Sequence, residues 1–200
     1  MVLKNDVIED EIDWAELART AHLRLNVGCG QFPMRYYCNL DSDPNAPAQV
    51  HADAIEYLKS LDANTLLEIY AGHFLEHLTH ADAMQFLAES YRVLQHRGRL
   101  AIVVPDAREI MQRWLAGAPD QVECPEGCWW RVNDLDDVCA LFVYSTVQDS
   151  PHRWLWDMWT LARAMQTAGF DELREIDRYH DPRLGTPQWY QCGIEGVKAK

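Results

Sequence analysis

Two glycines and an acid near the start of the chain have the types and spacing of a nucleoside-binding site. Gly28 and Gly30 directly follow an apolar stretch at 23–27, and Asp41 follows a second apolar stretch at 36–40. Glycine lets the backbone pass close to a ligand, because it has no Cβ and reaches positive φ. A carboxylate at the tip of the next strand can accept hydrogen bonds from both hydroxyls of a ribose. The spacing therefore predicts a nucleoside-cofactor site at the carboxyl ends of two neighbouring strands.

A second acid lies between a predicted strand and a predicted helix. Asp53 ends the segment 49–53 and precedes a helix expected at 55–61. In that position its carboxylate can accept a hydrogen bond from an adenine amino group. Alternatively, it only caps the helix that follows it.

Titratable residues also follow the apolar strand predicted at 66–71. His73 and His77 are four residues apart, which puts them on one face if the segment is helical. Zinc needs a third ligand, and none is evident nearby in the sequence. We expect Glu76 and His77 to bond the backbone at the turn, and we expect no metal.

Cysteines suggest a second metal site only weakly. A zinc site could be formed by Cys124, Cys128, Cys139 and His152. The Cys-x3-Cys spacing of the first two, without a second close pair, is a poor match to known zinc sites. Cys29 and Cys38 are expected to be small buried residues.

The predicted elements around these residues alternate between strands and helices. We expect an amphipathic helix at 5–20, and a helix that begins near Thr79 and ends with Gly98 as its C-cap. The apolar run at 100–104 is typical of a central parallel strand. Further elements are expected as a helix at 107–115, a helix from Asp157 to Gly169, and strands at 172–178 and 189–198.

One domain accounts for most of the 200 residues. We assign residues 1–22 to an N-terminal helix and 23–200 to the main domain. Within it, residues 107–151 break the alternating pattern, because the helix at 107–115 is followed by a segment without a regular repeat that holds Gly117, Pro119, Pro125, Gly127 and the pair Trp129-Trp130. We interpret residues 107–151 as a lid or a substrate-binding insertion. The link at 31–35 between the first two strands is too short for an ordinary crossover helix.

Composition narrows the classes of partner. The net charge of −13 disfavours a nucleic-acid partner, since such a chain repels phosphate. The sequence contains no run of about 18 apolar residues, the length that a membrane-spanning helix needs. The acidic N-terminal segment carries no apolar signal region, so we expect a cytoplasmic protein with reduced cysteines. The oligomeric state is not predictable from the sequence.

Four blocks of residues, in order along the chain, resemble the class I S-adenosylmethionine-dependent methyltransferases. The match is closest to a small bacterial group of predicted methyltransferases. The four blocks lie at 25–30, at 39–41, at 69–77, and at 152–154 running into 168–170. The resemblance implies an α/β fold: a Rossmann-like, doubly wound, mostly parallel sheet of seven strands, the last one antiparallel.

The resemblance also implies roles for individual residues. S-adenosylmethionine would contact the glycine block, the acids after the second and third strands, and the end of the fourth strand. The residues carried over for cofactor binding are Asn26, Gly28, Cys29, Gly30, Asp41, Asp53, Ala54, Ala71 and His73. Within this set, Asp41 would hold the ribose and Asp53 the adenine.

The implied reaction is in-line transfer of the sulfonium methyl group to an acceptor. We expect a small molecule or a saccharide as acceptor. A hydroxyl acceptor needs a base within hydrogen-bond reach, and the candidates are His152, His73 and Asp106. For His152 a role as a capping or core-bonded histidine is an equally good interpretation.

Two other functions compete with methyl transfer. A nicotinamide oxidoreductase would carry Gly-x-Gly-x-x-Gly, but this chain has Pro33 at the third glycine position. A non-catalytic S-adenosylmethionine-binding partner or regulatory protein would keep the cofactor residues without a catalytic base.

Overall fold

The computed structural model describes residues 20–116, 152–176 and 190–199. The helix predicted at 5–20 lies almost wholly outside these residues, as does the segment 117–151 of the predicted insertion. Within the described part of the chain, no helix has the length and apolar character needed to cross a membrane.

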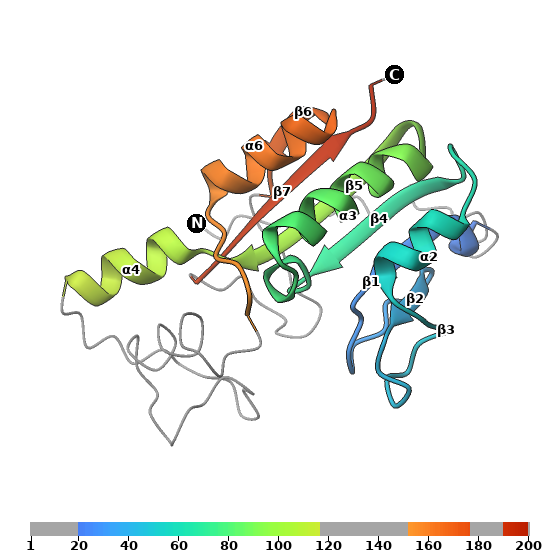
Figure 1. Ribbon diagram of the computed structural model, residues 1–200, viewed down its shortest axis with the longest axis horizontal. Helices are drawn as coiled ribbons and strands as arrows, with labels where there is room; N and C mark the ends of the chain where they lie inside the picture. Colours follow the sequence, from blue (N-terminus) through green and yellow to red (C-terminus); the bar gives the residue numbers. More distant parts are fainter. Residues whose placement is uncertain (1–19, 117–151, 177–189, 200) are drawn as a thin grey trace, which may run out of the picture.

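Seven strands form one sheet in the order β3-β2-β1-β4-β5-β7-β6 (Figure 1). Strands β1 to β5 pair in parallel, whereas β7 runs antiparallel to both β5 and β6. The prediction of a mostly parallel sheet with an antiparallel last strand is therefore confirmed. The strands are β1 Arg24–Val27, β2 Cys38–Asp41, β3 Val50–His51, β4 Leu66–Gly72, β5 Leu94–Pro105, β6 Asp171–Glu175 and β7 Gln191–Val197.

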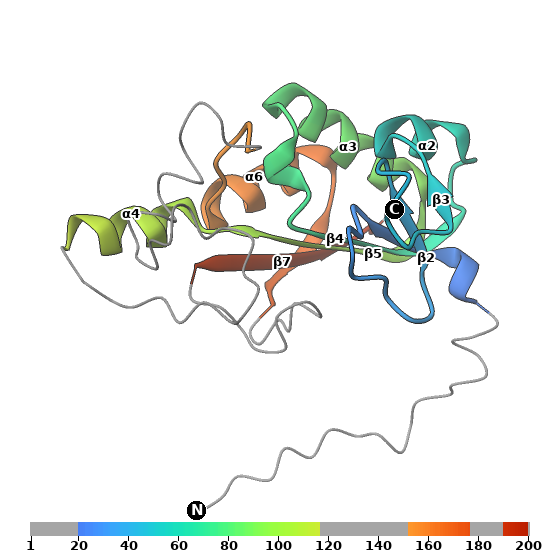
Figure 2. The same ribbon diagram turned by 90° about the horizontal axis from the view of Figure 1, so that it is seen from below.

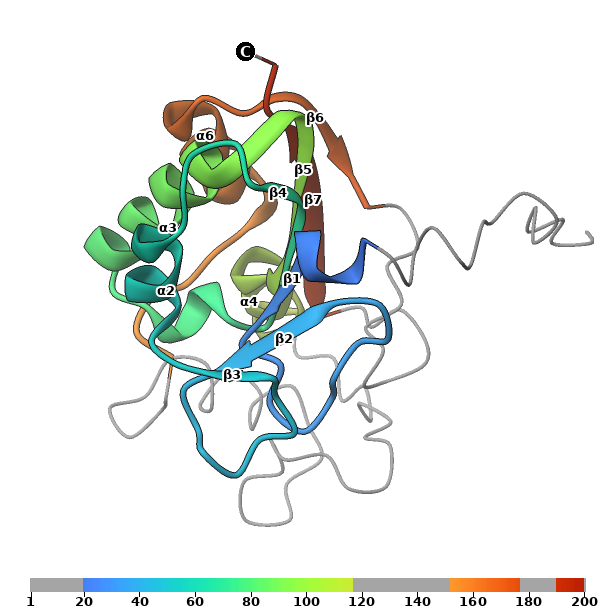
Figure 3. The same cartoon turned by 90° about the vertical axis from the view of Figure 1, so that its right-hand side faces the viewer.

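The main core lies between the sheet and the helices of one face. Figure 3 shows α2, α3 and α6 side by side on that face, and Figure 2 gives the same layers from below. Among the largest fully buried side chains are Phe86, Trp156 and Phe170. The helices are α2 Ala54–Ser60, α3 His80–Val93, α4 Ala107–Leu115 and α6 Met158–Ala168, with short 3-10 turns η2 Ala21–Leu23 and η3 Leu75–His77.

The link between β1 and β2 contains no crossover helix, although the two strands are parallel. A buried asparagine pair braces it instead. The Asn26 amide donates to Asn39 Oδ1 (2.8 Å), which also accepts from the Met34 N–H (2.7 Å). Tyr36 has a φ of 66°, outside the range of a strand, so β2 begins at Cys38 and not at residue 36 as predicted.

The end of α3 corrects a second prediction. The helix ends at Val93, and Leu94 is already extended, with a ψ of 142°. Gly98 is therefore not a helix cap but part of β5, where an added Cβ would lie 2.8 Å from the Gln95 carbonyl oxygen. Leu94 is fully buried in the strand, as it would be on the inner face of a helix, so its apolar character does not mark where the helix ends.

The two ends of α6 were predicted correctly. Asp157 and Thr160 form a capping box, and Gly169 ends the helix in the left-handed conformation with a φ of 106°. The predicted boundaries of β6 and β7 differ from the observed ones by at most three residues where the chain is described.

Candidate functional site

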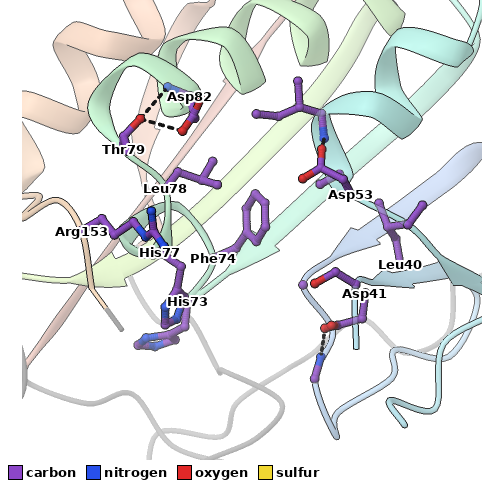
Figure 4. A pocket seen from close by; sticks show the side chains of 16 residues that line it. Leu40, Asp41, Asp53, His73, Phe74, His77, Leu78, Thr79, Asp82 and Arg153 are labelled. Carbon is purple, nitrogen blue, oxygen red and sulfur yellow. Dashed lines mark hydrogen bonds between the residues drawn. The ribbon is translucent and has the colours of Figure 1, made fainter. Parts of the chain in front are cut away.

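A pocket of about 700 Å³ opens at the carboxyl ends of β1 to β4 (Figure 4). Parallel strands bring the loops that follow them to one edge of the sheet, where α/β folds bind ligands. The lining residues are Gly28, Gly30, Leu40, Asp41, Ser42, Ala52, Asp53, Ala54, Ile55, His73, Phe74, His77, Leu78, Thr79, Asp82 and Arg153.

Asp41 fastens the glycine turn to the end of β2. Its Oδ2 accepts from the Gly30 N–H (2.7 Å), and its Oδ1 accepts from the Asp43 N–H (2.9 Å). The Gly28 N–H donates to the Leu40 carbonyl (2.9 Å), a second bond between the turn and the end of β2. A carboxylate has about four lone-pair sites, so Asp41 can still accept two further hydrogen bonds.

Gly28 is a position that only glycine fits. Its φ is +64°, and a Cβ there would lie 2.7 Å from Cδ2 of Phe74. Phe74, which follows β4, thus packs directly on the turn after β1. Gly30 also has a positive φ of +52°, but no atom lies within 4 Å of its Cβ position.

Asp53 caps α2, as the alternative interpretation required. Its Oδ1 accepts from the N–H groups of Ile55 (2.9 Å) and Glu56 (3.0 Å). Both bonds use Oδ1, so Oδ2 remains for a ligand in the pocket. Capping and ligand binding are therefore compatible at this residue.

His73 lies just beyond β4 in a left-handed conformation, with a φ of 51°. The His73 N–H donates to the Val103 carbonyl (2.8 Å), which fixes the residue on β5. Its ring nitrogens lie 3.2 Å from Glu76 Oε1 and 3.0 Å from Gln191 Oε1. Both ring positions thus already have polar neighbours, although the residue lines the pocket.

Glu76, His77 and His152 meet beside the pocket. Their potential ligand atoms lie within 4.8 Å of one another. The Glu76 carbonyl accepts from the N–H groups of Arg153 (2.7 Å) and Trp154 (3.3 Å), which brings His152 to this place. The main-chain carbonyl of Glu76 makes these bonds, whereas its side chain faces His73, so the backbone-bonding role expected for Glu76 and His77 stays a prediction.

The electrostatics of this group favour one charged carboxylate and one neutral imidazole. Burial opposes the charge of Glu76, but the hydrogen bond from His73 and the nearby histidines lower its pKa. Burial lowers the pKa of His152 to about 4, against the opposing effect of Glu76. At neutral pH, His152 is therefore an uncharged ring in contact with His77, with ring centroids 5.0 Å apart.

The structure brings six of the predicted cofactor residues to the pocket: Gly28, Gly30, Asp41, Asp53, Ala54 and His73. Asn26, Cys29 and Ala71 are buried and are not among its lining residues. Burial and the nearby Asp41 raise the pKa of the Cys29 thiol to about 11, so it is neutral. The roles predicted for these three residues stay predictions.

Asp106, a predicted catalytic residue, lies at the start of α4. Its Oδ1 accepts from the N–H groups of Arg108 (3.0 Å) and Glu109 (3.2 Å), as an N-cap does. It is not among the residues that line the pocket. A catalytic role for it stays a prediction.

Several lining residues were not assigned from the sequence. Phe74 and Arg153 belong to blocks matched by resemblance, but no spacing rule pointed to their side chains. Thr79 and Asp82 lie at the start of α3, where the sequence analysis places only the beginning of a helix. The Asp82 N–H donates to Thr79 Oγ1 (3.2 Å), which caps the helix, and Thr79 Oγ1 lies 2.6 Å from Asp82 Oδ2. Nothing in the sequence signals that this cap also faces the pocket.

Solved structures of methyltransferases share this fold. A methyltransferase from Archaeoglobus fulgidus is 17% identical with a TM-score of 0.57, over 92% of each chain. A possible histamine N-methyltransferase from Thermotoga maritima is 15% identical with a TM-score of 0.56, over 88% of this chain and 81% of that one. Phosphoethanolamine N-methyltransferase 2 from Haemonchus contortus, in complex with S-adenosyl-L-methionine, is 10% identical with a TM-score of 0.53. The match covers 88% of this chain and 48% of that one.

These likenesses establish the fold, which is that of the S-adenosylmethionine-dependent methyltransferases. No protein-family model matches the sequence, and no curated protein matches it either.

Proposed function

We propose that the chain is an S-adenosylmethionine-dependent methyltransferase that acts on a small-molecule or saccharide acceptor. The observation that carries this proposal is the position of Asp41. Its carboxylate lies at the carboxyl end of β2, holds the Gly30 N–H at 2.7 Å, and faces a pocket of about 700 Å³. A drug-sized or nucleoside ligand needs a pocket of about this volume.

The residues present fit the cofactor. Asp41 has acceptor capacity left for a ribose diol, and Asp53 Oδ2 is available for an amino group. The space beside the turn stays open because Gly30 carries no side chain. When bound, S-adenosylmethionine supplies a methyl group on a positively charged sulfur, already activated toward a nucleophile.

The chain's own contribution would be to hold the nucleophile in line and to exclude water. Positioning of this kind can lower a barrier by about 7–11 kcal/mol. His73, at the pocket wall, and His152, beside it, stay the candidate bases for a hydroxyl acceptor. A pKa of about 4 makes His152 a weak proton acceptor at neutral pH.

Charge and aromatic surface support the class of acceptor. A net charge of −13 disfavours nucleic acid. Trp154, next to the pocket residue Arg153, is 42% exposed, and an exposed indole suits a planar or sugar-like molecule. Two structural neighbours carry names that refer to small amines, histamine and phosphoethanolamine.

Calorimetric titration with S-adenosylmethionine and S-adenosylhomocysteine, with NAD as a control ligand, tests cofactor binding. Asp41→Asn removes the charge but keeps an acceptor for the Gly30 N–H. Hydrogen bonds to charged groups are worth about 1.5–3 kcal/mol, so we expect about tenfold to hundredfold weaker binding.

Asp43→Asn is the matched control, because Asp43 is an exposed acid of the same loop that does not line the pocket. We expect it to bind like the wild type. Binding of neither adenosyl compound would overturn the proposal.

The alternative function, a non-catalytic S-adenosylmethionine-binding partner or regulatory protein, predicts the same binding in this titration. Release of S-adenosylhomocysteine in the presence of a panel of small hydroxyl, amine and sugar acceptors separates the two. Tight cofactor binding without turnover on any of them would favour the alternative.

A further inference from the structure

We propose that Glu76, His77 and His152 bind one divalent transition-metal ion of the zinc type at the edge of the pocket. The ligand atoms that these residues offer lie within 4.8 Å of one another. None of the three is among the residues proposed to contact the cofactor, but His77 and the neighbouring His73 line the same pocket. A metal ion here would give His152 the role of a ligand in place of that of a base.

The set of ligands fits this class of ion. Imidazole nitrogen suits zinc and its neighbours, and a carboxylate oxygen completes a three-ligand set. Bonds of about 2.0–2.2 Å place the ligand atoms of one tetrahedral ion about 3.3 Å apart. Side-chain shifts of about an ångström therefore bring the three residues onto one ion.

Glu76 supplies an independent reason to expect a cation. The residue is 2% exposed, and its Oε1 faces His73 Nδ1 at 3.2 Å. Its other oxygen, Oε2, is buried without a hydrogen-bond partner among the described residues. A buried carboxylate oxygen without a partner is costly, and a metal ion at this place would remove that cost.

The surroundings hold the three ligands as a metal site requires. His73 contacts the Glu76 carboxylate from the side, as an outer-shell partner orients a ligand. The Arg153 N–H, bonded to the Glu76 carbonyl, fixes the backbone next to His152. Two ligands are thus adjacent in the short turn η3, and the third is tied to the same turn by the backbone.

The fourth position would face the pocket. His77 is itself a lining residue, so an ion on its ring lies at the pocket wall. Three protein ligands with one open position are typical of catalytic zinc sites, whereas structural sites use four.

Titration of the metal-free full chain with Zn²⁺ by calorimetry, and with Co²⁺ by visible absorption, tests the proposal. We expect one ion per chain and Co²⁺ bands of a four- or five-coordinate site without thiolate charge transfer. Glu76→Gln, His77→Gln and His152→Gln should each weaken binding at least tenfold. His73→Gln, in the outer shell, should weaken it by about tenfold to a hundredfold.

His80→Gln is the matched control, because His80 is a nearby histidine that does not belong to the three-residue group. Its ring packs on that of Trp154, with ring centroids 4.6 Å apart. It should bind zinc like the wild type. Thermal unfolding of the metal-free variants checks that each is folded, and the three ligand variants test the site separately.

Absence of zinc and cobalt binding, or binding that survives all three ligand substitutions, would overturn the proposal. A thiolate band in the Co²⁺ spectrum would do so too, because it would place the ion on cysteines. S-adenosylhomocysteine binding is measured on the same samples, so a failure of the cofactor proposal is seen separately.

Discussion

At the scale of single residues, the two glycines of the turn do different work. Both have positive φ, but only at Gly28 would a Cβ meet another side chain, Phe74, at 2.7 Å. Gly30 instead offers its N–H to Asp41 and leaves open space above it. One glycine permits packing between the loops after β1 and β4, and the other leaves room for a ligand.

Substitution of the two glycines separates these effects. Both Gly28→Ala and Gly30→Ala pay for left-handed backbone, about 1–2 kcal/mol. Gly28→Ala also forces Phe74 away, so we expect a total loss of about 2–4 kcal/mol in the free energy of unfolding. Urea unfolding measures both. Equal losses in the two variants would contradict the close packing at Gly28.

The Cys29 thiol gives a prediction about pH. Its pKa is raised from 9.0 to about 11, chiefly by burial, so at pH 8 the reactive thiolate is about a hundredfold rarer than in the unfolded chain. Alkylation by iodoacetamide, followed on the Cys29 peptide by mass spectrometry, should be slow in the native protein and rise with pH toward 11. The same peptide in urea is the control. Similar rates in both states would refute the raised pKa.

At the scale of elements, local signals predicted some boundaries and missed others. Gly169 was recognised as the end of α6 because a helix end in the left-handed conformation favours glycine. The start near Asp157 was predicted without its capping role. The end of α3 was missed because burial alone cannot tell a helical leucine from a strand leucine at Leu94. The braced link between β1 and β2 was also unforeseen, because Asn26 and Asn39 meet only once the two strands are paired.

The capping box of α6 can be tested directly. Asp157→Ala removes the acceptor for the Thr160 N–H (2.8 Å) and should cost about 1 kcal/mol of stability. Asp157→Asn keeps a capping oxygen and loses mainly the exposed ion pair with Arg108, so its cost should be smaller. Urea unfolding at neutral pH compares the two. A larger loss in the asparagine variant would show that the charge matters more than the cap.

At the scale of the whole molecule, the sequence brought the glycines and acids of the pocket together better than its histidines. Gly28, Gly30 and Asp41 are close in sequence, so their spacing carried the information. His152 and His77 are far apart in sequence, and only the fold brings their rings together. The topology of the sheet came from resemblance, because hydrophobic periodicity does not specify strand order.

A ligand that binds only the folded chain stabilises the whole domain. S-adenosylhomocysteine at a hundred times its dissociation constant should add about 2.7 kcal/mol. For a chain of this size the melting temperature should rise by about 5–10 °C. Thermal unfolding with and without the ligand measures this shift. Asp41→Asn at the same ligand concentration should show a much smaller one, and a shift of equal size with NAD would contradict a specific site.

The strand order has a consequence for synthesis on the ribosome. β7 lies between β5 and β6, although it follows both in the chain. Until residues 191–197 have left the exit tunnel, neither the outer edge of β5 nor the edge of β6 that pairs with β7 has a partner among the described strands. Unpaired edges invite association with other chains, so the nascent protein is most exposed to aggregation just before its last strand is inserted.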